Sequence, residues 1–407
     1  MRREVLITGA SVLNSVADDL DGFTAALREG RSGVRAVDLP AESRAGVAAQ
    51  LDGFSVAAWT QRHLHDAPDA AARLQRATRR SALPGQTAAC VAEEALRSAG
   101  LEDRENTALI VAGNNLALGY HAEALRGFHD RPSSLRPSHV LTHLDTDVVG
   151  TVSEATGVAG EGWTAGAASA SSTVAAILGA RLVAAGEVDS CLVVAPVAEL
   201  SAAELRAFRD SGAMAAPDEE VAPRQLCRPF DAQRRGFVHG QGAAAIVLES
   251  RARVRPLASI AGWGQRLDAR RGTDPNPAGQ AAALRAALAS ARVRPHEVDY
   301  VNAHGTGSKA GDTAEAHALT EVFGSAPLVN STKPLVGHCL TAAGLQELIA
   351  TALQLRGGFV HGNPNLHEPI DEDLPLVGQA AKAAPIRLAV SNSVAFSGIN
   401  AAIVLRS

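Results

Sequence analysis

The sequence contains few aromatic residues and few lysines. Phe, Trp and Tyr together make up 3% of the 407 residues, and apart from Lys309, Lys333 and Lys382 every strongly basic residue is an arginine. The arginines are scattered along the chain and the formal net charge is −5, so a basic, aromatic-rich surface for nucleic acid is not expected. Small molecules or other proteins are the expected partners.

Cysteine is also scarce. The cysteines stand at positions 90, 191, 227 and 339 without a CxxC spacing, which argues against a zinc or redox motif and favours reduced, buried thiols. We therefore expect no bound metal. The sequence also lacks an uninterrupted apolar run of about 18 residues and a signal-peptide pattern after Met1. These absences predict a cytoplasmic protein that does not associate with a membrane.

Short apolar runs alternate with helical patterns along the chain. The predicted strands are 4–8, 108–112, 191–197, 243–248, 259–261, 298–302, 328–330, 388–391 and 401–405. The predicted helices are 85–99, 173–185, 201–210, 280–291, 312–323 and 341–355. This alternation indicates an α/β fold. Because no linker composition separates two modules, we expect two halves that share one core and meet near residue 255.

Two glycine-rich turns follow predicted strands, and each carries a histidine. His304 lies in the segment NAHGTGS (302–308), and His338 lies in VGHCLTAAG (336–344). Junctions between a strand and a helix are where α/β folds place their sites, and small neighbours leave room for a substrate. One such histidine could equally be a hydrogen-bonded loop residue, but two of them indicate an active site.

Lys333 ends the segment NSTK (330–333), in a chain that otherwise uses arginine almost throughout. A compact ammonium suits the ordering or charge balance of a carboxylate such as Glu347, which lies in the following predicted helix. The alternative is a solvated surface lysine. We interpret Lys333 as part of the site.

These segments resemble the two histidine motifs of the β-ketoacyl synthases, and the similarity continues along nearly the whole chain. The other matching segments are VLITG (5–9), GRSG (30–33), RPFD (228–231), GFVHGQG (236–242) and NSVAFSGIN (392–400). The resemblance implies the thiolase-like fold, an α/β fold with layers α-β-α-β-α and two mixed sheets. It divides the chain into an N-terminal half, 1–255, and a C-terminal half, 256–407, which carries His304 and His338.

Members of that family carry a nucleophilic cysteine at the N-terminus of a buried helix, where the helix dipole favours the thiolate. The matching segment here is AASASS (167–172), which puts Ser169 at the position of the cysteine. A serine hydroxyl is a poor nucleophile unless a base activates it. Acyl transfer to the enzyme, and with it condensation, is therefore disfavoured.

The family's other reaction, decarboxylation of a malonyl thioester, does not need a thiol. Histidine and backbone donors aimed at the enolate oxygen contribute about 3–4 kcal/mol each in comparable sites. The resemblance implies catalytic roles for Ser169, His304, His338 and Lys333, substrate contacts for Thr306, Phe396 and Asn400, and supporting roles for Asp312 and Glu347.

The segments 166–171 and 357–366 resemble one subgroup in particular. These are the decarboxylating enzymes of HMG-CoA-synthase-type β-branching cassettes in polyketide pathways, which carry serine here and convert malonyl-acyl carrier protein to acetyl-acyl carrier protein. We expect this activity. Two alternatives stay open: a serine-dependent acyltransferase in which a histidine deprotonates Ser169, and a non-catalytic partner resembling a chain-length factor.

The resemblance also implies the partners. We expect a homodimer, and an acyl carrier protein whose phosphopantetheine arm brings the substrate to Ser169 past Phe396. No bound cofactor is expected.

Overall fold

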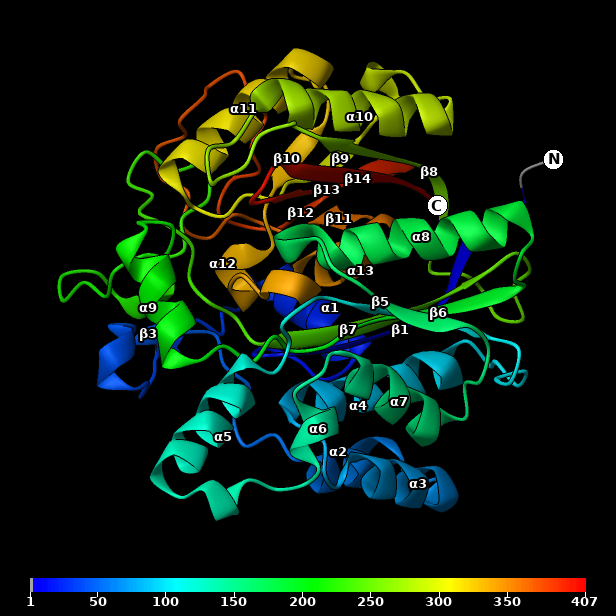
Figure 1. The fold of residues 1–407 in the computed structure, drawn as a ribbon. Coiled ribbons are helices and arrows are strands. Elements are labelled where there is room, and N and C mark those ends of the chain that lie inside the picture. The colour runs from blue at the N-terminus through cyan, green and yellow to red at the C-terminus, as the bar shows by residue number, and fades with distance from the viewer. Residues whose placement is uncertain (1–2) are drawn as a thin grey trace.

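The computed structural model describes residues 3–407 and contains a ten-stranded mixed sheet with helices inside and outside it (Figure 1). The strand order is β10-β9-β13-β14-β8-β1-β7-β6-β4-β5. The strands of the N-terminal half are β1 (Leu6–Asn14), β4 (Ala108–Ala112), β5 (Gly162–Ala165), β6 (Ser190–Ala195) and β7 (Gly242–Glu249). Those of the C-terminal half are β8 (Ala258–Leu267), β9 (Tyr300–Asn302), β10 (Leu328–Asn330), β13 (Leu388–Ala395) and β14 (Ile399–Arg406).

The two halves of the sheet have the same topology. From the outer edge inward, the pairs β5-β4 and β4-β6 are parallel and β6-β7 and β7-β1 are antiparallel. The pairs β10-β9 and β9-β13 are likewise parallel, and β13-β14 and β14-β8 are antiparallel. The two halves of the chain therefore form an internal structural repeat. A comparison of their residue identities does not reveal this repeat.

The two mixed sheets that were expected are present as two layers, and the structure shows how they are joined. The halves are joined at β1 and β8 by the residue pairs Leu6–Ser259 and Ile7–Ala258. The contact between β1 and β8 is limited to these two pairs because the rest of β8 pairs with β14. The strands form one continuous array that folds into two layers (Figure 1).

Helices complete the layers. The helices α8 (Ser171–Ala185) and α13 (Ala343–Gly357) lie between the two sheet layers (Figure 1). The outer face of the N-terminal half is covered by α4 (Leu83–Ser98) and α7 (Thr146–Thr156), and that of the C-terminal half by α10 (Pro277–Ala291) and α11 (Lys309–Phe323). The layer order is therefore α-β-α-β-α, as expected for the thiolase-like fold.

The central helix α8 explains a feature that the sequence alone leaves ambiguous. The helical stretch Ala168–Ala185 has a mean hydropathy of 1.4, and by length and composition it could cross a membrane. In the fold, 67% of it is buried between the sheet layers. A helix that is apolar all round suits such a position.

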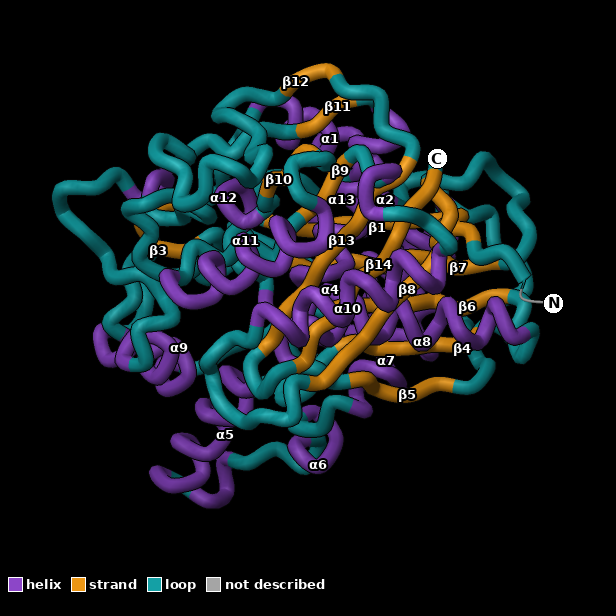
Figure 2. The backbone as a smooth tube through the Cα atoms, turned by 90° about the horizontal axis from the view of Figure 1, so that it is seen from above, coloured by secondary structure: helices purple, strands orange, loops and turns teal. Residues whose placement is uncertain are grey.

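All predicted strands and helices are present, with bounds that differ by up to six residues, the largest differences being at the ends of β1 and β8. The remaining helices are α1 (Leu20–Glu29), α2 (Val56–His63), α3 (Pro68–Thr78), α5 (Leu118–Asp130), α6 (His139–Thr142), α9 (Ala202–Asp210) and α12 (Lys333–Val336). Two small two-stranded sheets consist of β2 (Arg35–Ala36) with β3 (Val47–Ala48) and of β11 (Phe359–Val360) with β12 (Lys382–Ala383). Helices α5 and α9 stand outside the five layers, away from the N-terminus (Figure 2).

Candidate active site

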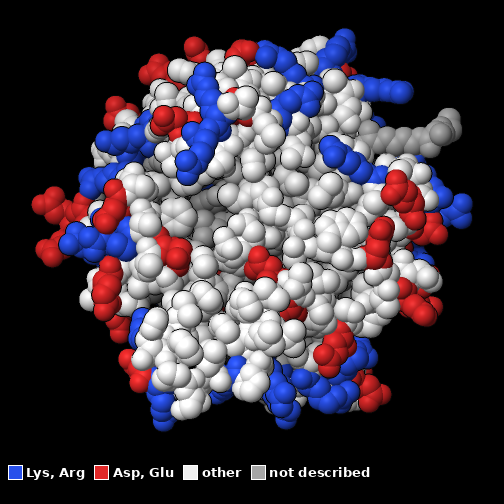
Figure 3. Space-filling model, in the orientation of Figure 1, with Lys and Arg blue, Asp and Glu red and all other residues white. Residues whose placement is uncertain are grey.

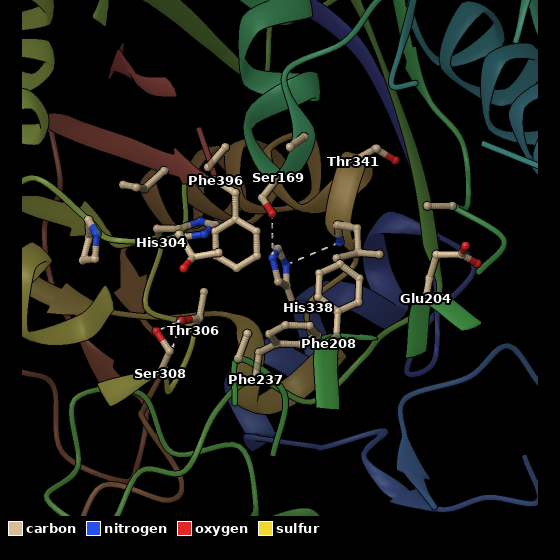
Figure 4. A pocket seen from close by; sticks show the side chains of 18 of the residues that line it. Ser169, Glu204, Phe208, Phe237, His304, Thr306, Ser308, His338, Thr341 and Phe396 are labelled. Atoms are coloured by element: carbon tan, nitrogen blue, oxygen red, sulfur yellow. Dashed lines mark hydrogen bonds between the residues drawn. The ribbon is translucent and has the colours of Figure 1, made fainter. Parts of the chain in front are cut away.

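A cavity of about 250 Å³ lies where the two halves meet, and side chains of both halves line it (Figure 4). Of the residues predicted for the site, Ser169, His304, Thr306, His338 and Phe396 line this cavity. Charged side chains of both signs gather at the periphery of the molecular face in Figure 3, and its centre is largely uncharged. The structure thus brings together five residues that are distant in sequence.

The parallel strands explain why His304 and Lys333 meet. Strand β9 ends at Asn302 and its parallel neighbour β10 ends at Asn330, and these two residues are paired in register. The turns that follow therefore leave the same edge of the sheet side by side. Lys333 Nζ lies 3.3 Å from Nδ1 of His304 and also donates a hydrogen bond to the carbonyl oxygen of His304.

Ser169 sits on a strained turn at the start of the central helix. It lies in a short 3₁₀ segment (Ala168–Ala170) that continues into α8. Ala168 has φ 46°, a left-handed conformation that costs free energy for a residue with a side chain. The hydroxyl of Ser171 holds the turn by donating to the carbonyl oxygen of Ala168 (2.7 Å) and accepting from the N–H of Ala167 (2.8 Å).

Ser169 Oγ lies 3.0 Å from Nε2 of His338 (Figure 4). The other ring nitrogen of His338, Nδ1, accepts a hydrogen bond from the N–H of Leu340 at 3.3 Å. A neutral imidazole has one donor and one acceptor nitrogen, so its proton is on Nε2. His338 therefore donates to Ser169 and cannot accept the proton of the serine.

The same reasoning fixes the proton of His304. The ammonium of Lys333 has only donors, so Nδ1 of His304 is the acceptor and Nε2 carries the proton. Burial lowers the pKa of both His304 and His338 well below 6.5, and Lys333 adds to the shift. Both rings are thus neutral at pH 7, and their centroids lie 5.4 Å apart at an interplanar angle of 84°.

Lys333 and Glu347 form a buried ion pair behind the cavity. Lys333 Nζ lies 2.5 Å from Oε1 of Glu347, and the two side chains are 1% and 3% exposed. Burial raises the pKa of Glu347 to about 7, and Lys333 opposes this shift. The ammonium therefore links Glu347 to the ring of His304, which agrees with the carboxylate partner expected for Lys333.

Two carboxylates of α11 hold the turn that carries His304. Glu315 accepts hydrogen bonds of 2.7 Å from the backbone N–H groups of His304 and Gly305, and Asn392 donates to the same carboxylate. Asp312 accepts from the N–H of Thr306 at 3.0 Å and from two other backbone groups. Asp312 thus has the supporting position that was expected for it. Glu315 was not assigned a role from the sequence, although its spacing of three residues puts it on the same helix face as Asp312.

The segment 236–242 fixes the backbone of His338. The N–H of His338 donates to the carbonyl oxygen of Val238 at 2.7 Å, and the N–H of Gly240 donates to the carbonyl oxygen of His338 at 3.0 Å. A Cβ atom at Gly240 would lie 2.2 Å from the carbonyl oxygen of Val336, so the close approach requires glycine. This contact explains why the segment contains a glycine at that position.

Three phenylalanines form one wall of the cavity. Phe237 meets the ring of His338 edge to face, with centroids 5.2 Å apart. Phe208 of α9 lies 5.4 Å from Phe237 and 6.5 Å from Phe396. Phe396 is 40% exposed, so the wall runs from the surface to His338 (Figure 4). Phe208 lies in no motif, and only the folded chain brings it here.

Asn400 does not occupy the position expected for a substrate contact. It is absent from the residues that line the cavity, is 1% exposed, and donates to Oδ1 of Asp268 at 2.8 Å. Asp268 lines the cavity instead. Asn400 is the second residue of strand β14, where its side chain is buried and bound to Asp268.

The sequence reasoning also missed Thr341, which lines the cavity next to Leu340. Its hydroxyl is buried without a hydrogen-bond partner among the described residues. Such a group costs about 1–3 kcal/mol unless a ligand or water satisfies it. Its position in the motif of His338 was visible in the sequence, but its lack of a partner was not.

The site contains no metal-binding geometry. Within residues 3–407, no group of three or more His, Cys, Asp or Glu side chains is arranged to hold a metal ion. All four cysteines are buried, and no cysteine of the described chain lines the cavity. The reactive groups of this cavity are therefore hydroxyls, imidazoles and the carboxyl groups of Glu204, Asp268 and Asp274.

Comparison with known proteins agrees with this arrangement. Residues 2–253 match the family model of the β-ketoacyl synthase N-terminal domain, and residues 257–367 match that of the C-terminal domain. The chain is 32% identical over 99% of its length to the polyketide biosynthesis malonyl-ACP decarboxylase PksF of Bacillus subtilis, of which it covers 96%. It is also 32% identical to nodulation protein E of a Rhizobium species, with both chains covered in full.

A solved structure shares the fold over its whole length. The structure titled "The ishigamide ketosynthase/chain length factor" superposes with a TM-score of 0.88 at 29% identity, and both chains are covered in full. The two family models together cover most of the sequence, from residue 2 to residue 367. This protein, with its thiolase-like fold, is thus a member of the β-ketoacyl synthase family.

Proposed function

We propose that the protein decarboxylates a malonyl thioester carried by an acyl carrier protein and leaves an acetyl thioester. The observation that carries this proposal is the position of the protons on His304 and His338. Both rings have Nδ1 occupied as an acceptor, so both carry an N–H at Nε2 and neither is free to act as a base. The pair is suited to stabilise an anion.

The reaction follows from these donors. The bond between C2 of the malonyl group and its carboxylate breaks, carbon dioxide leaves, and the electron pair moves into the thioester to give an enolate. The negative charge develops on the thioester oxygen, where the Nε2–H of His304 stabilises it and the Nε2–H of His338 is shared between this oxygen and Ser169 Oγ. Each such donor contributes about 3–4 kcal/mol in comparable sites. Uptake of one proton at C2 then gives the acetyl thioester.

The surroundings of the site support loss of carbon dioxide. Phe208, Phe237 and Phe396 line the cavity and offer no hydrogen bond to a carboxylate. Apolar walls lower the local dielectric constant and so strengthen the interaction of the enolate oxygen with its donors. The similarity to PksF, which is named a malonyl-ACP decarboxylase, supports the same reaction and the same kind of substrate.

The two alternatives are less well supported. A serine-dependent acyltransferase needs a base for Ser169, and the histidine beside it is a donor. A non-catalytic partner does not need a buried Lys333 and Glu347, and a buried ion pair is weak support for stability. The homodimer, the cytoplasmic location and the absence of a cofactor stay predictions.

Mass spectrometry of malonyl-carrier protein tests the proposal. The wild-type protein should convert it to acetyl-carrier protein, and His304→Ala should slow this strongly. His296→Ala is the matched control, because His296 is exposed on a surface turn. Accumulation of a malonyl group on the enzyme without acetyl product would favour the acyltransferase. An unchanged substrate would favour the non-catalytic partner.

A further inference from the structure

The geometry points to a role for Ser169 beyond that of a silenced nucleophile: we propose that its hydroxyl delivers the proton that converts the enolate into the acetyl group. This inference rests on the proposed decarboxylation. In this proposal Ser169 is the acid that completes the reaction. Serine is then required at this position because its hydroxyl supplies the proton.

The hydrogen bonds of Ser169 leave its proton free. Its oxygen accepts the Nε2–H of His338 at 3.0 Å, and this is the one side-chain hydrogen bond of Ser169 among the described residues. A hydroxyl has one proton in addition to its acceptor positions. Because Ser169 lines the cavity, that proton can turn toward a bound substrate.

The surroundings stabilise the alkoxide that remains after the transfer. His338 keeps its Nε2–H directed at the oxygen. Ser169 also lies at the N-terminal end of the helical segment that continues into α8, where the helix dipole favours negative charge. The carbanion carbon of a thioester enolate is a much stronger base than an alkoxide, so the transfer runs downhill.

The proton balance is complete with water as the second reactant. The electron pair of the enolate forms a C–H bond at C2, the O–H bond of Ser169 breaks, and its electrons stay on Oγ. A water molecule in the cavity then returns a proton to Oγ and leaves as hydroxide. A cavity of about 250 Å³ has room for water beside a small acyl group. One solvent proton is consumed for each carbon dioxide released.

Other acids are less well placed. Three carboxyl groups line the cavity, those of Glu204, Asp268 and Asp274. Glu204 accepts a hydrogen bond from the N–H of Ser201, Asp268 accepts one from Asn400, and Asp274 is exposed to solvent. The buried groups Lys333, Asp312, Glu315 and Glu347 do not line the cavity. The hydroxyl of Thr306 is directed at Ser308 and Asp312. Thr341 has a hydroxyl without a partner, but this oxygen is shielded from the cavity by burial. Ser169 is therefore the best placed donor, and Thr341 provides the matched control.

The stereochemistry of protonation tests the role of Ser169. Malonyl-carrier protein with tritium at one of the two positions on C2 is decarboxylated in D₂O, and the configuration of the resulting chiral methyl group is measured. A fixed donor protonates one face of the enolate. We expect one configuration from the wild-type protein and from Thr341→Val, and a racemic methyl group from Ser169→Ala.

The outcomes separate the two proposals. If the wild-type protein releases no carbon dioxide, both the proposed function and the protonation role of Ser169 are wrong. If carbon dioxide is released but Ser169→Ala retains the configuration of the wild type, or the wild type gives a racemic product, only the protonation role is overturned. Loss of configuration in Thr341→Val alone would assign the proton to Thr341. Ser169→Gly gives the same comparison if the alanine variant does not fold.

Discussion

Ser169 accepts a hydrogen bond from His338, and this direction of donation separates the site from a Ser-His nucleophile pair. The direction is fixed from behind the ring, because the N–H of Leu340 occupies Nδ1 of His338. Leu340 itself has φ 50°, an unusual value for a residue with a side chain. The structure thus accepts backbone strain at the residue that holds the imidazole in its donor form.

The first prediction concerns covalent acylation. Ser169 has no base, so incubation with malonyl-carrier protein should leave the mass of the wild-type protein unchanged. Ser169→Cys places a thiol at the start of the same helix, where the dipole favours the thiolate. This variant should gain an acyl adduct. A stable adduct on wild-type Ser169, located by peptide mapping, would contradict the assigned proton positions.

The second prediction concerns the two histidines. His338→Ala removes the donor to Ser169 and to the enolate oxygen, so kcat should fall about 10²–10³-fold, which is the loss found when one oxyanion donor is removed. His304→Ala should have an effect of similar size. The His296→Ala control should keep the wild-type rate. Changes confined to KM in the two active-site variants would argue for a role in binding only.

The third prediction concerns Asp312. Its carboxylate accepts hydrogen bonds from the backbone N–H groups of Phe230, Thr306 and Gly307. An amide has one acceptor oxygen, so Asp312→Asn leaves at least one buried donor unsatisfied, at a cost of about 1–3 kcal/mol. Urea unfolding should show this loss. Asp130→Asn, at the exposed C-terminal end of α5, should be nearly neutral. Equal stability of the two variants would argue against the role of Asp312 in holding the turn.

The fourth prediction concerns pH. Burial raises the pKa of Glu347 from 4.5 to about 7, so the folded protein binds more protons than the unfolded chain between these values. The stabilising contribution is fully present below pH 4.5 and is lost as the pH rises through about 7. Asp312, whose pKa is raised to about 7 by burial, acts in the same direction.

Unfolding by urea across this pH range measures the effect. Stability should decrease with increasing pH, and Glu347→Gln, which cannot ionise, should show a smaller decrease. A Glu347→Gln protein with the same pH slope as the wild type would show that Glu347 ionises normally in the folded state.

The sequence predicts the buried strands well because they are apolar on both faces. Strands β4 and β10 have the predicted bounds, and every residue of β4 is buried. Strand β5 was missed because it is short, lies at the edge of the sheet and is partly exposed, so it has no apolar run. Helix α5 was not predicted. It has no buried residue, so its sequence lacks the periodic apolar pattern that indicates a buried helix face.

The site is predictable where its residues lie in turns next to strands. His304 and Lys333 follow β9 and β10, and the parallel pairing of these strands brings them together. Residues such as Phe208 and Thr341 are different. Their roles depend on which side chains face them after folding, and neighbours along the chain do not specify this. Asn400 shows the reverse case, since it lies in a recognisable motif but its side chain binds Asp268 and does not itself line the cavity.

The buried cysteines determine how this protein responds to oxidants and alkylating agents. Oxidants and alkylating agents react with exposed thiolates, whereas burial raises the pKa of all four thiols, to about 12 for Cys227 and Cys339. With an alcohol at the reactive position, the catalytic cavity has no soft nucleophile for such reagents. The proposed activity should therefore persist under oxidative conditions that inactivate relatives with a cysteine at this position. Electrophilic inhibitors that alkylate such a cysteine should not modify this protein.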